Sequence, residues 1–148
     1  MTTSPYISGI TYDQVWAYRP FDPATHTPSP LVNAVAKALY STRYIRSNDI
    51  AKYLCIEERL LRAVVQVELG MKLSDLLHRY RIDQADEYIR THPGQNLNQV
   101  AHAIGYSSDS TLWRFYQRMR KETPLGHKSH AHQELWLKWR EEKKKRQR

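Results

Sequence analysis

The sequence predicts an all-α fold, and three observations support this prediction. Apolar residues recur every three or four positions from residue 31 onward. No alternating strand pattern occurs beyond the first thirty residues. A helical unit near residue 50 occurs again near residue 100. We therefore expect two helix-turn-helix subdomains joined by a long connector helix, with an extended N-terminal arm and an extra C-terminal helix.

The composition restricts the classes of protein to which this chain can belong. Its 148 residues, 41% of them hydrophobic, suffice for one domain or two small ones. A single cysteine, Cys55, excludes a disulfide framework and a Cys-rich zinc module. No apolar run approaches the roughly 20 residues that cross a bilayer, and the N-terminus lacks the pattern of an export signal. We expect a cytoplasmic protein with no membrane partner.

The net charge points to a polyanionic partner. Lys and Arg total 23 against 15 Asp and Glu, which leaves a net charge of +8. Half of this excess lies in residues 139–148. That run fits a solvated tail and an arm that contacts phosphates equally well.

Residues 1–29 are expected to form an extended arm outside the main core. Five of the seven prolines lie in the first thirty residues, and each removes a backbone donor and opposes a long helix. The segment is nevertheless aromatic, so we expect it to dock on its own domain rather than on a partner. Its aromatic residues are Tyr6, Tyr12, Trp16, Tyr18 and Phe21.

Residues 30–92 are assigned to the first subdomain and the connector. Ser29 is a candidate N-cap and precedes Pro30 at the first helical position. Ser47 or Asn48 is expected to cap the next helix, and Gly70 to end the one after it. The expected helices cover residues 30–42, 49–54, 57–69 and 74–92.

Residues 93–128 are assigned to the second subdomain. Asn98 is expected to cap a short helix that ends at Ile104, and Ser107 or Ser108 to open a longer one that ends near Lys121. Residues 129–148 are assigned to a C-terminal amphipathic helix and the basic tail. The apolar side of this last helix comprises Ala131, Leu135, Trp136 and Trp139.

Each copy of the internal repeat is expected to contain a short helix, a tight turn and a longer helix, with the two helices crossed at a steep angle. In the second copy, Gly105 stands at the bend, where a residue without Cβ takes a positive φ freely, and Tyr106 fills the corner. A shift of 50 places Ile50, Ala51 and Leu54 on Val100, Ala101 and Ile104, and a shift of 51 places Leu61 and Val65 on Leu112 and Tyr116.

These residues carry a family resemblance. The motif Ala101-x-x-x-Gly105-Tyr106-Ser107-Ser108-x-Ser110-x-Leu112-x-Arg114-x-Tyr116, followed by Thr123-Pro124, resembles the signature of AraC/XylS-type transcriptional regulators. The segment Arg81-Ile82-x-x-Ala85-x-x-Tyr88-Ile89 is similar to the helix between the two repeats in that family. The resemblance covers about residues 31–128. It implies a seven-helix, two-subdomain domain that inserts one helix of each repeat into successive major-groove segments of DNA.

The second helix of the second repeat carries most of the candidate DNA-contacting residues. Arg114 can pair with guanine O6 and N7, and Gln117 can address adenine or a phosphate. Ser110 and Thr111 suit a base edge or a phosphate near the helix start. Trp113 either packs on a thymine methyl or a sugar, or is buried against a neighbouring helix. Arg118 and Lys121 are assigned to backbone phosphates.

The equivalent helix of the first repeat has a thinner polar stripe of Arg59, Arg62 and Gln66. Either Arg59 and Arg62 read bases here, or this half supports the fold or contacts a protein partner. The sequence departs from the family pattern at Cys55 in place of glycine, Glu57 in place of a serine cap, Ala63 in place of arginine, and Val67 at a commonly basic position.

Other candidate chemistry is weaker. His127, His130 and His132 lie within six residues but have no suitable companion ligand except Glu134, so we expect a solvated turn and no metal site. Cys55 is expected to fill a helix corner as a small hydrophobe. No carboxylate pair, phosphate loop or nucleophile–histidine pair has a persuasive spacing. We therefore expect no enzyme activity and no cofactor.

Together these patterns predict a sequence-specific DNA-binding transcription regulator that binds double-stranded DNA as a monomer. RNA polymerase or another regulator is a candidate protein partner. The alternative is a protein-interaction module with a degenerate first helix-turn-helix and weak, non-specific DNA binding. The unusually apolar first reading helix and its acidic start, Glu57-Glu58, motivate that alternative.

Overall fold

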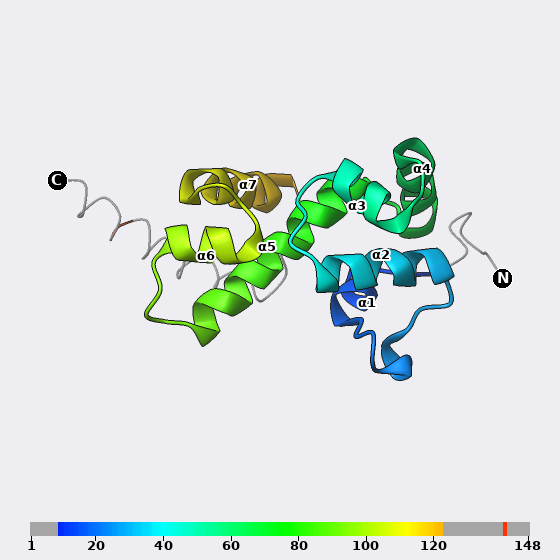
Figure 1. The fold of residues 1–148 in the computed structure, drawn as a ribbon, viewed down its shortest axis with the longest axis horizontal. Helices are drawn as coiled ribbons and strands as arrows, with labels where there is room; N and C mark the ends of the chain where they lie inside the picture. The colour runs from blue at the N-terminus through cyan, green and yellow to red at the C-terminus, as the bar shows by residue number, and fades with distance from the viewer. Residues whose placement is uncertain (1–8, 123–140, 142–148) are drawn as a thin grey trace. The chain divides into compact units, whose positions relative to one another are not determined.

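The computed structural model describes residues 9–122 and residue 141, except for the side chains of residues 120–122. Within this part of the chain every regular element is helical, so the all-α prediction is confirmed there. Figure 1 shows the helices in chain order. They are α1 (Tyr12–Ala17), the 3-10 helix η1 (Pro23–Thr25), α2 (Pro30–Ser41), α3 (Ser47–Leu54), α4 (Glu58–Leu69), α5 (Leu73–Thr91), α6 (Leu97–Ile104) and α7 (Asp109–Glu122).

The chain divides into two compact units, residues 1–81 and residues 82–148. The division falls within the connector helix α5, whereas the sequence predicts a boundary after residue 92. In the described residues, no helix has the length and apolar character needed to span a membrane. The predicted C-terminal helix and the basic tail, apart from residue 141, and the three candidate histidines lie outside the described residues.

The N-terminal segment is not extended throughout residues 9–29, because α1 and η1 are short helices within it. Its prolines lie outside α1, where Thr11 and Gln14 form a reciprocal capping box that starts a short helix. Val15 of α1 is fully buried in the core. Trp16 meets Tyr80 of α5 edge to face at 5.0 Å between ring centroids. The expected docking of this segment on its own domain is therefore confirmed, but as part of the core.

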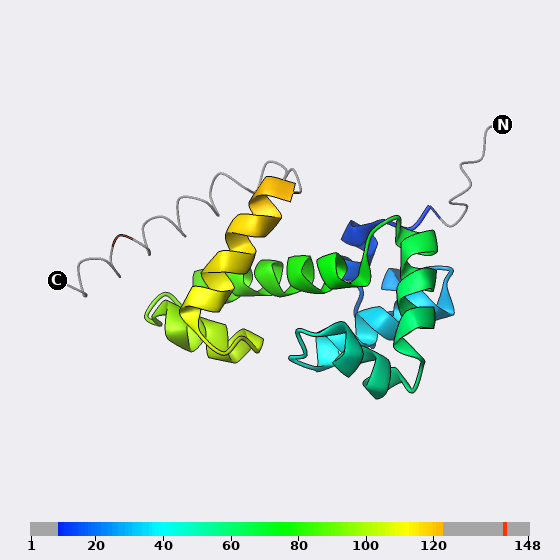
Figure 2. The ribbon, with the colours of Figure 1, turned by 90° about the horizontal axis from the view of Figure 1, so that it is seen from above.

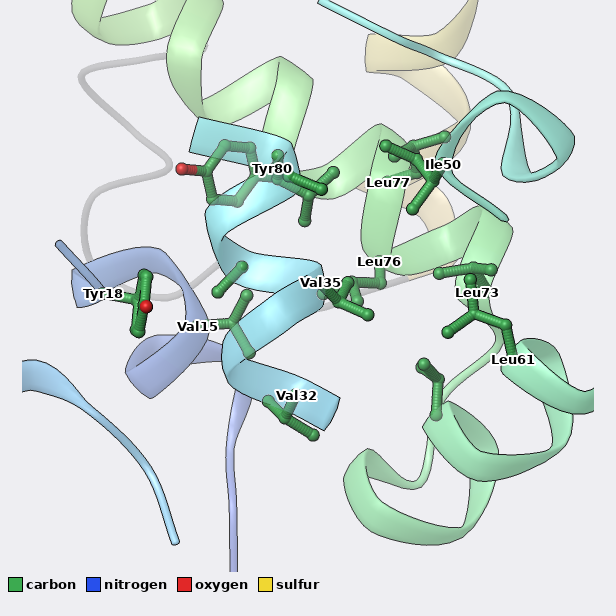
Figure 3. Close-up of a cluster of buried hydrophobic side chains, with 14 of the residues drawn as sticks. Val15, Tyr18, Val32, Val35, Ile50, Leu61, Leu73, Leu76, Leu77 and Tyr80 are labelled. Carbon is green, nitrogen blue, oxygen red and sulfur yellow. The ribbon is translucent and has the colours of Figure 1, made fainter. Parts of the chain in front are cut away.

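The core of the first unit is built where α1, α2, α4 and α5 present aliphatic side chains to one another (Figure 3). Val35, Leu61 and Leu76 are at most 1% exposed. Burial of each such side chain contributes about 1.5–3 kcal/mol to folding. This packing holds α4 in place through Leu61 and Val65, so that the opposite side of α4 faces solvent.

A buried arginine fixes the connection between α2 and α3. Arg81 of α5 is completely buried, and its guanidinium donates to the Leu39 carbonyl at 2.7 Å and to the Tyr44 carbonyl at 2.8 Å. It also donates to the Thr42 hydroxyl at 3.3 Å. Leu39 lies in the last turn of α2, so Arg81 satisfies a carbonyl group that the helix leaves without an intrahelical partner, and its other bonds hold the loop after α2.

The helix caps confirm some predictions and correct others. Ser29 caps α2 as predicted, since its hydroxyl accepts from the Val32 amide at 3.2 Å and also donates to Glu68. The prediction of Ser47 or Asn48 as a cap was wrong, because α3 already begins at Ser47 and has no side-chain capping bond. The prediction that Asn98 caps the next helix was also wrong. The cap of α6 is Asn96, two residues before Asn98, and it forms a capping box with Gln99.

Candidate nucleic-acid interface

The two crossed helix pairs, α3–α4 and α6–α7, have the same turn. Each first helix ends in a residue with a left-handed backbone, Cys55 at φ 57° and Gly105 at φ 117°. The Ala51 carbonyl accepts the Ile56 amide at 3.0 Å, and the Ala101 carbonyl accepts the Tyr106 amide at 2.9 Å. These bonds close both turns in the same way. The predicted repeat is therefore also a repeat of backbone geometry.

The inserted residue of the second copy lies just before α7. The turn residues correspond at an offset of 50, whereas α4 begins at Glu58 and α7 at Asp109, an offset of 51. Ser108 then caps α7, as predicted, because its hydroxyl accepts the Thr111 amide at 3.2 Å. The Thr111 hydroxyl lies 3.0 Å from that of Ser108. The half-buried Thr111 side chain thus takes part in the helix start.

Helix α7 separates a buried face from an exposed polar face. Leu112, Tyr116 and Met119 are at most 1% exposed, and α7 contacts α6, as Figure 2 shows from above. Ser110 and Arg114 are exposed on the other side, as is Arg118. The predicted orientation, with Arg114 outward and Leu112 and Tyr116 inward, is what the structure has.

The side chains of the remaining predicted residues of α7 are half-buried, or are not among those that the structure describes. Trp113 is half-buried and stacks on Tyr116 at 5.5 Å between ring centroids. Gln117 is also half-buried. Lys121 belongs to α7, but its side chain lies outside the described residues. The exposed part of the predicted site on this helix is therefore Ser110, Arg114 and Arg118.

Helix α4 also has one buried and one exposed face. Leu61 and Val65 are fully buried, while Arg59, Arg62 and Gln66 are exposed as predicted. Arg62 lies 3.8 Å from the Glu58 carboxylate, one turn earlier. Because α4 contains two arginines and two glutamates, its formal charges cancel. This helix therefore attracts a polyanion less than α7 does, because the sequence of α7 contains four basic and two acidic residues.

The apolar character that the sequence shows in this helix forms a stripe on the exposed face of α4. Leu60 is 56% exposed and Val67 is 58% exposed, with the exposed Ala63 between them along the helix. A signal existed, because these residues lie three and four positions apart and opposite Leu61 and Val65. Ala63 and Val67 stand where the family pattern is basic, and the sequence did not place them with Leu60 on one face.

The prediction that Cys55 fills a buried corner was wrong, because this cysteine is exposed. Its position at the turn imposes a positive φ. A helix C-terminus commonly ends in this conformation, for which glycine is the usual residue. Cys55 thus serves as the C-cap of α3 and not as a core residue.

Comparison with known proteins agrees with this geometry. A model of the helix-turn-helix domain family matches residues 50–128, which include α4, α6, α7 and α3 from Ile50 onward. The HTH-type transcriptional regulator VirS of Mycobacterium tuberculosis, found in strains CDC 1551 / Oshkosh and ATCC 25618 / H37Rv, is 32% identical over 109 residues. The match covers 74% of this chain but only 32% of the VirS sequence, so the chain spans about a third of these curated relatives. No solved structure matches the chain. The chain belongs to the AraC/XylS-type helix-turn-helix family.

Proposed function

We propose that this chain is a sequence-specific DNA-binding transcription regulator, in which α4 and α7 each enter a segment of the major groove. The observation that carries this proposal is the outward position of Arg114 on α7, opposite the buried Leu112 and Tyr116. An α-helix fits the major groove, and a guanidinium there can pair with guanine O6 and N7. Family membership supports the same function.

Other exposed cations on the two helices are assigned to the DNA backbone. Arg118 on α7 and Arg59 on α4 are exposed, and Lys121 follows Arg118 by three positions, close to one helical turn. Contacts of this kind fix the register of a protein on DNA but carry no sequence information. Ser110, exposed in the first turn of α7, is assigned to a phosphate or base edge there.

The chain is proposed to bind as a monomer to an asymmetric site. The outer surface of α4 is partly apolar and formally neutral, whereas that of α7 is polar and basic, so the two helices suit different base sequences. One chain then reads two different half-sites without a symmetric partner. RNA polymerase or another regulator is the proposed protein partner of the DNA-bound chain.

The test is a selection of binding sites from random duplex DNA with the full chain at about 0.15 M salt, where long-range electrostatic attraction is screened. We expect an asymmetric sequence to be enriched. Binding that is insensitive to sequence and is lost as salt rises would contradict the proposal.

A second candidate function is a protein-interaction module, which the acidic start of α4 favours. Glu57 and Glu58 precede the exposed residues of α4 and repel phosphates. This module would bind a regulator or a polymerase subunit and contact DNA only weakly. The same selection separates the two functions, because the module enriches no sequence.

A further inference from the structure

The exposed side of α4 consists of two stripes with different chemistry. At about 100° per residue, Arg59, Arg62 and Gln66 lie within about 60° of one another. Leu60, Ala63 and Val67 lie within a neighbouring sector of about 60°, and neither sector contains the buried Leu61 and Val65. More than half of the Leu60 and Val67 side chains is exposed, although both are aliphatic. An apolar stripe of this kind on a proposed reading helix offers a surface that an apolar group of a partner can contact.

The alignment of the two helix pairs shows which residues of α7 this stripe replaces. At the offset of 51 residues that relates α4 to α7, Ala63 corresponds to Arg114 and Val67 to Arg118. Leu60 corresponds to Thr111. The buried residues correspond as well, since Leu61 aligns with Leu112 and Val65 with Tyr116. At positions where α7 presents guanidinium groups, α4 thus presents methyl groups.

We propose that Leu60, Ala63 and Val67 contact the C5-methyl groups of thymines, so that α4 selects a thymine-rich half-site. This inference rests on the proposed function. The thymine methyl is an apolar group that each A·T pair presents in the major groove, and aliphatic side chains contact it. Leu60 and Val67 are separated by about 10 Å along the helix axis, which is about three base-pair steps. Two to four neighbouring thymines can therefore lie along the stripe.

The size and surroundings of the stripe favour DNA over a protein as its partner. A stable protein interface buries about 800 Å² on each side and involves about 20–30 residues. The stripe offers three small aliphatic side chains on one helix. Arg59 and Arg62 lie directly beside it, and cations at this place suit the phosphates that border the major groove. The cations along one edge of the stripe and its small apolar area thus both fit duplex DNA.

The test uses the full chain and the duplex obtained from the selection described above, with each thymine replaced in turn by uracil. This exchange removes only the C5-methyl group and preserves base pairing. In the half-site that is not affected by Arg114→Ala, we expect each contacted methyl to be worth about three- to fourfold in affinity. We call the loss of affinity on exchange of thymine for uracil the uracil penalty. In the double variant Leu60→Ala/Val67→Ala, these uracil penalties should disappear, while the effect of Arg114→Ala should persist.

Phe21→Ala is the matched control, because Phe21 is an apolar side chain of the same unit that is 75% exposed and lies outside α4. This variant should retain every uracil penalty. Uracil penalties that are absent from the wild type, or that survive the double substitution in the α4 half-site, would overturn the inference and leave the proposed function intact. Failure to enrich any sequence would overturn the proposed function and this inference together.

Discussion

The α3–α4 and α6–α7 pairs share their backbone geometry but differ in their outer surfaces. Both have a buried alanine before the turn, a left-handed residue at the turn, and an aliphatic residue followed by a second buried residue four positions later. The exposed side carries Ala63 and Val67 in α4 but Arg114 and Arg118 in α7. A few inward positions thus determine how the helices cross, and the outward positions remain available for different partners.

The largest expected effect tests the shared core of the two pairs. Leu61→Ala and Leu112→Ala each remove a leucine side chain that is fully buried. Each change should lower the free energy of unfolding by about 2–5 kcal/mol, because it leaves a cavity among packed helices. Urea denaturation followed by circular dichroism measures both losses.

Leu60→Ala serves as the control for this pair, because it truncates the neighbouring leucine at a position that is more than half exposed. Its effect on unfolding should stay within about 0.5 kcal/mol. If Leu61→Ala or Leu112→Ala were as mild as Leu60→Ala, the corresponding helix pair would not be packed as described.

The next largest effect concerns the two turns, where the equivalent positions are occupied by Cys55 and Gly105. Gly105→Ala places a Cβ at φ 117° and should destabilise the protein by about 1–3 kcal/mol. Cys55→Gly relieves a side chain held at φ 57° and should stabilise it by about 0.5 kcal/mol. Thermal unfolding of both variants shows whether each change raises or lowers the stability of the protein. Equal signs would show that the two turns do not impose the same backbone conformation.

The smallest effect concerns the ion pair that distinguishes the exposed side of α4. Glu58→Gln removes the carboxylate that lies 3.8 Å from Arg62 and leaves the guanidinium available to phosphates. We expect DNA affinity to rise about twofold to fivefold, and stability to change by less than about 1 kcal/mol because the pair is largely exposed. A fluorescence anisotropy titration measures the affinity.

Asp13→Asn removes an acidic charge from α1 and is the matched control for Glu58→Gln. It should leave the affinity unchanged. An equal gain in both variants would assign the effect to net charge, and no gain in either would remove Arg62 from the DNA-contacting surface.

Hydrophobic periodicity predicted the helices of the core correctly because each buries a continuous apolar face. The N-terminal helix was missed since the number of prolines over residues 1–29 hid the proline-free stretch that forms α1. Asn96 and Asn98 are both acceptable caps by residue type, and only the position of Gln99 three residues after Asn96 distinguishes them. Local patterns thus predict a helix more reliably than its first residue.

The candidate site was predicted in part for a similar reason. Periodicity placed Arg114 opposite Leu112 and Tyr116, because one helix alone determines that relation. The exposure of Cys55 depends on how the chain turns between two helices, which a pattern within one helix does not report. The exposed stripe of Leu60, Ala63 and Val67 was not recognised because Ala63 and Val67 were compared with the family pattern and not with their neighbours on the helix.

The most direct test of the central claim is a pair of parallel selections from random duplex DNA, one with the wild type and one with Arg114→Ala. We predict that the variant loses base preference in one half of the asymmetric site and binds the wild-type sequence about 1–3 kcal/mol more weakly. The other half should be selected unchanged. Identical selected sequences and affinities for the two proteins would show that the exposed face of α7 does not read DNA.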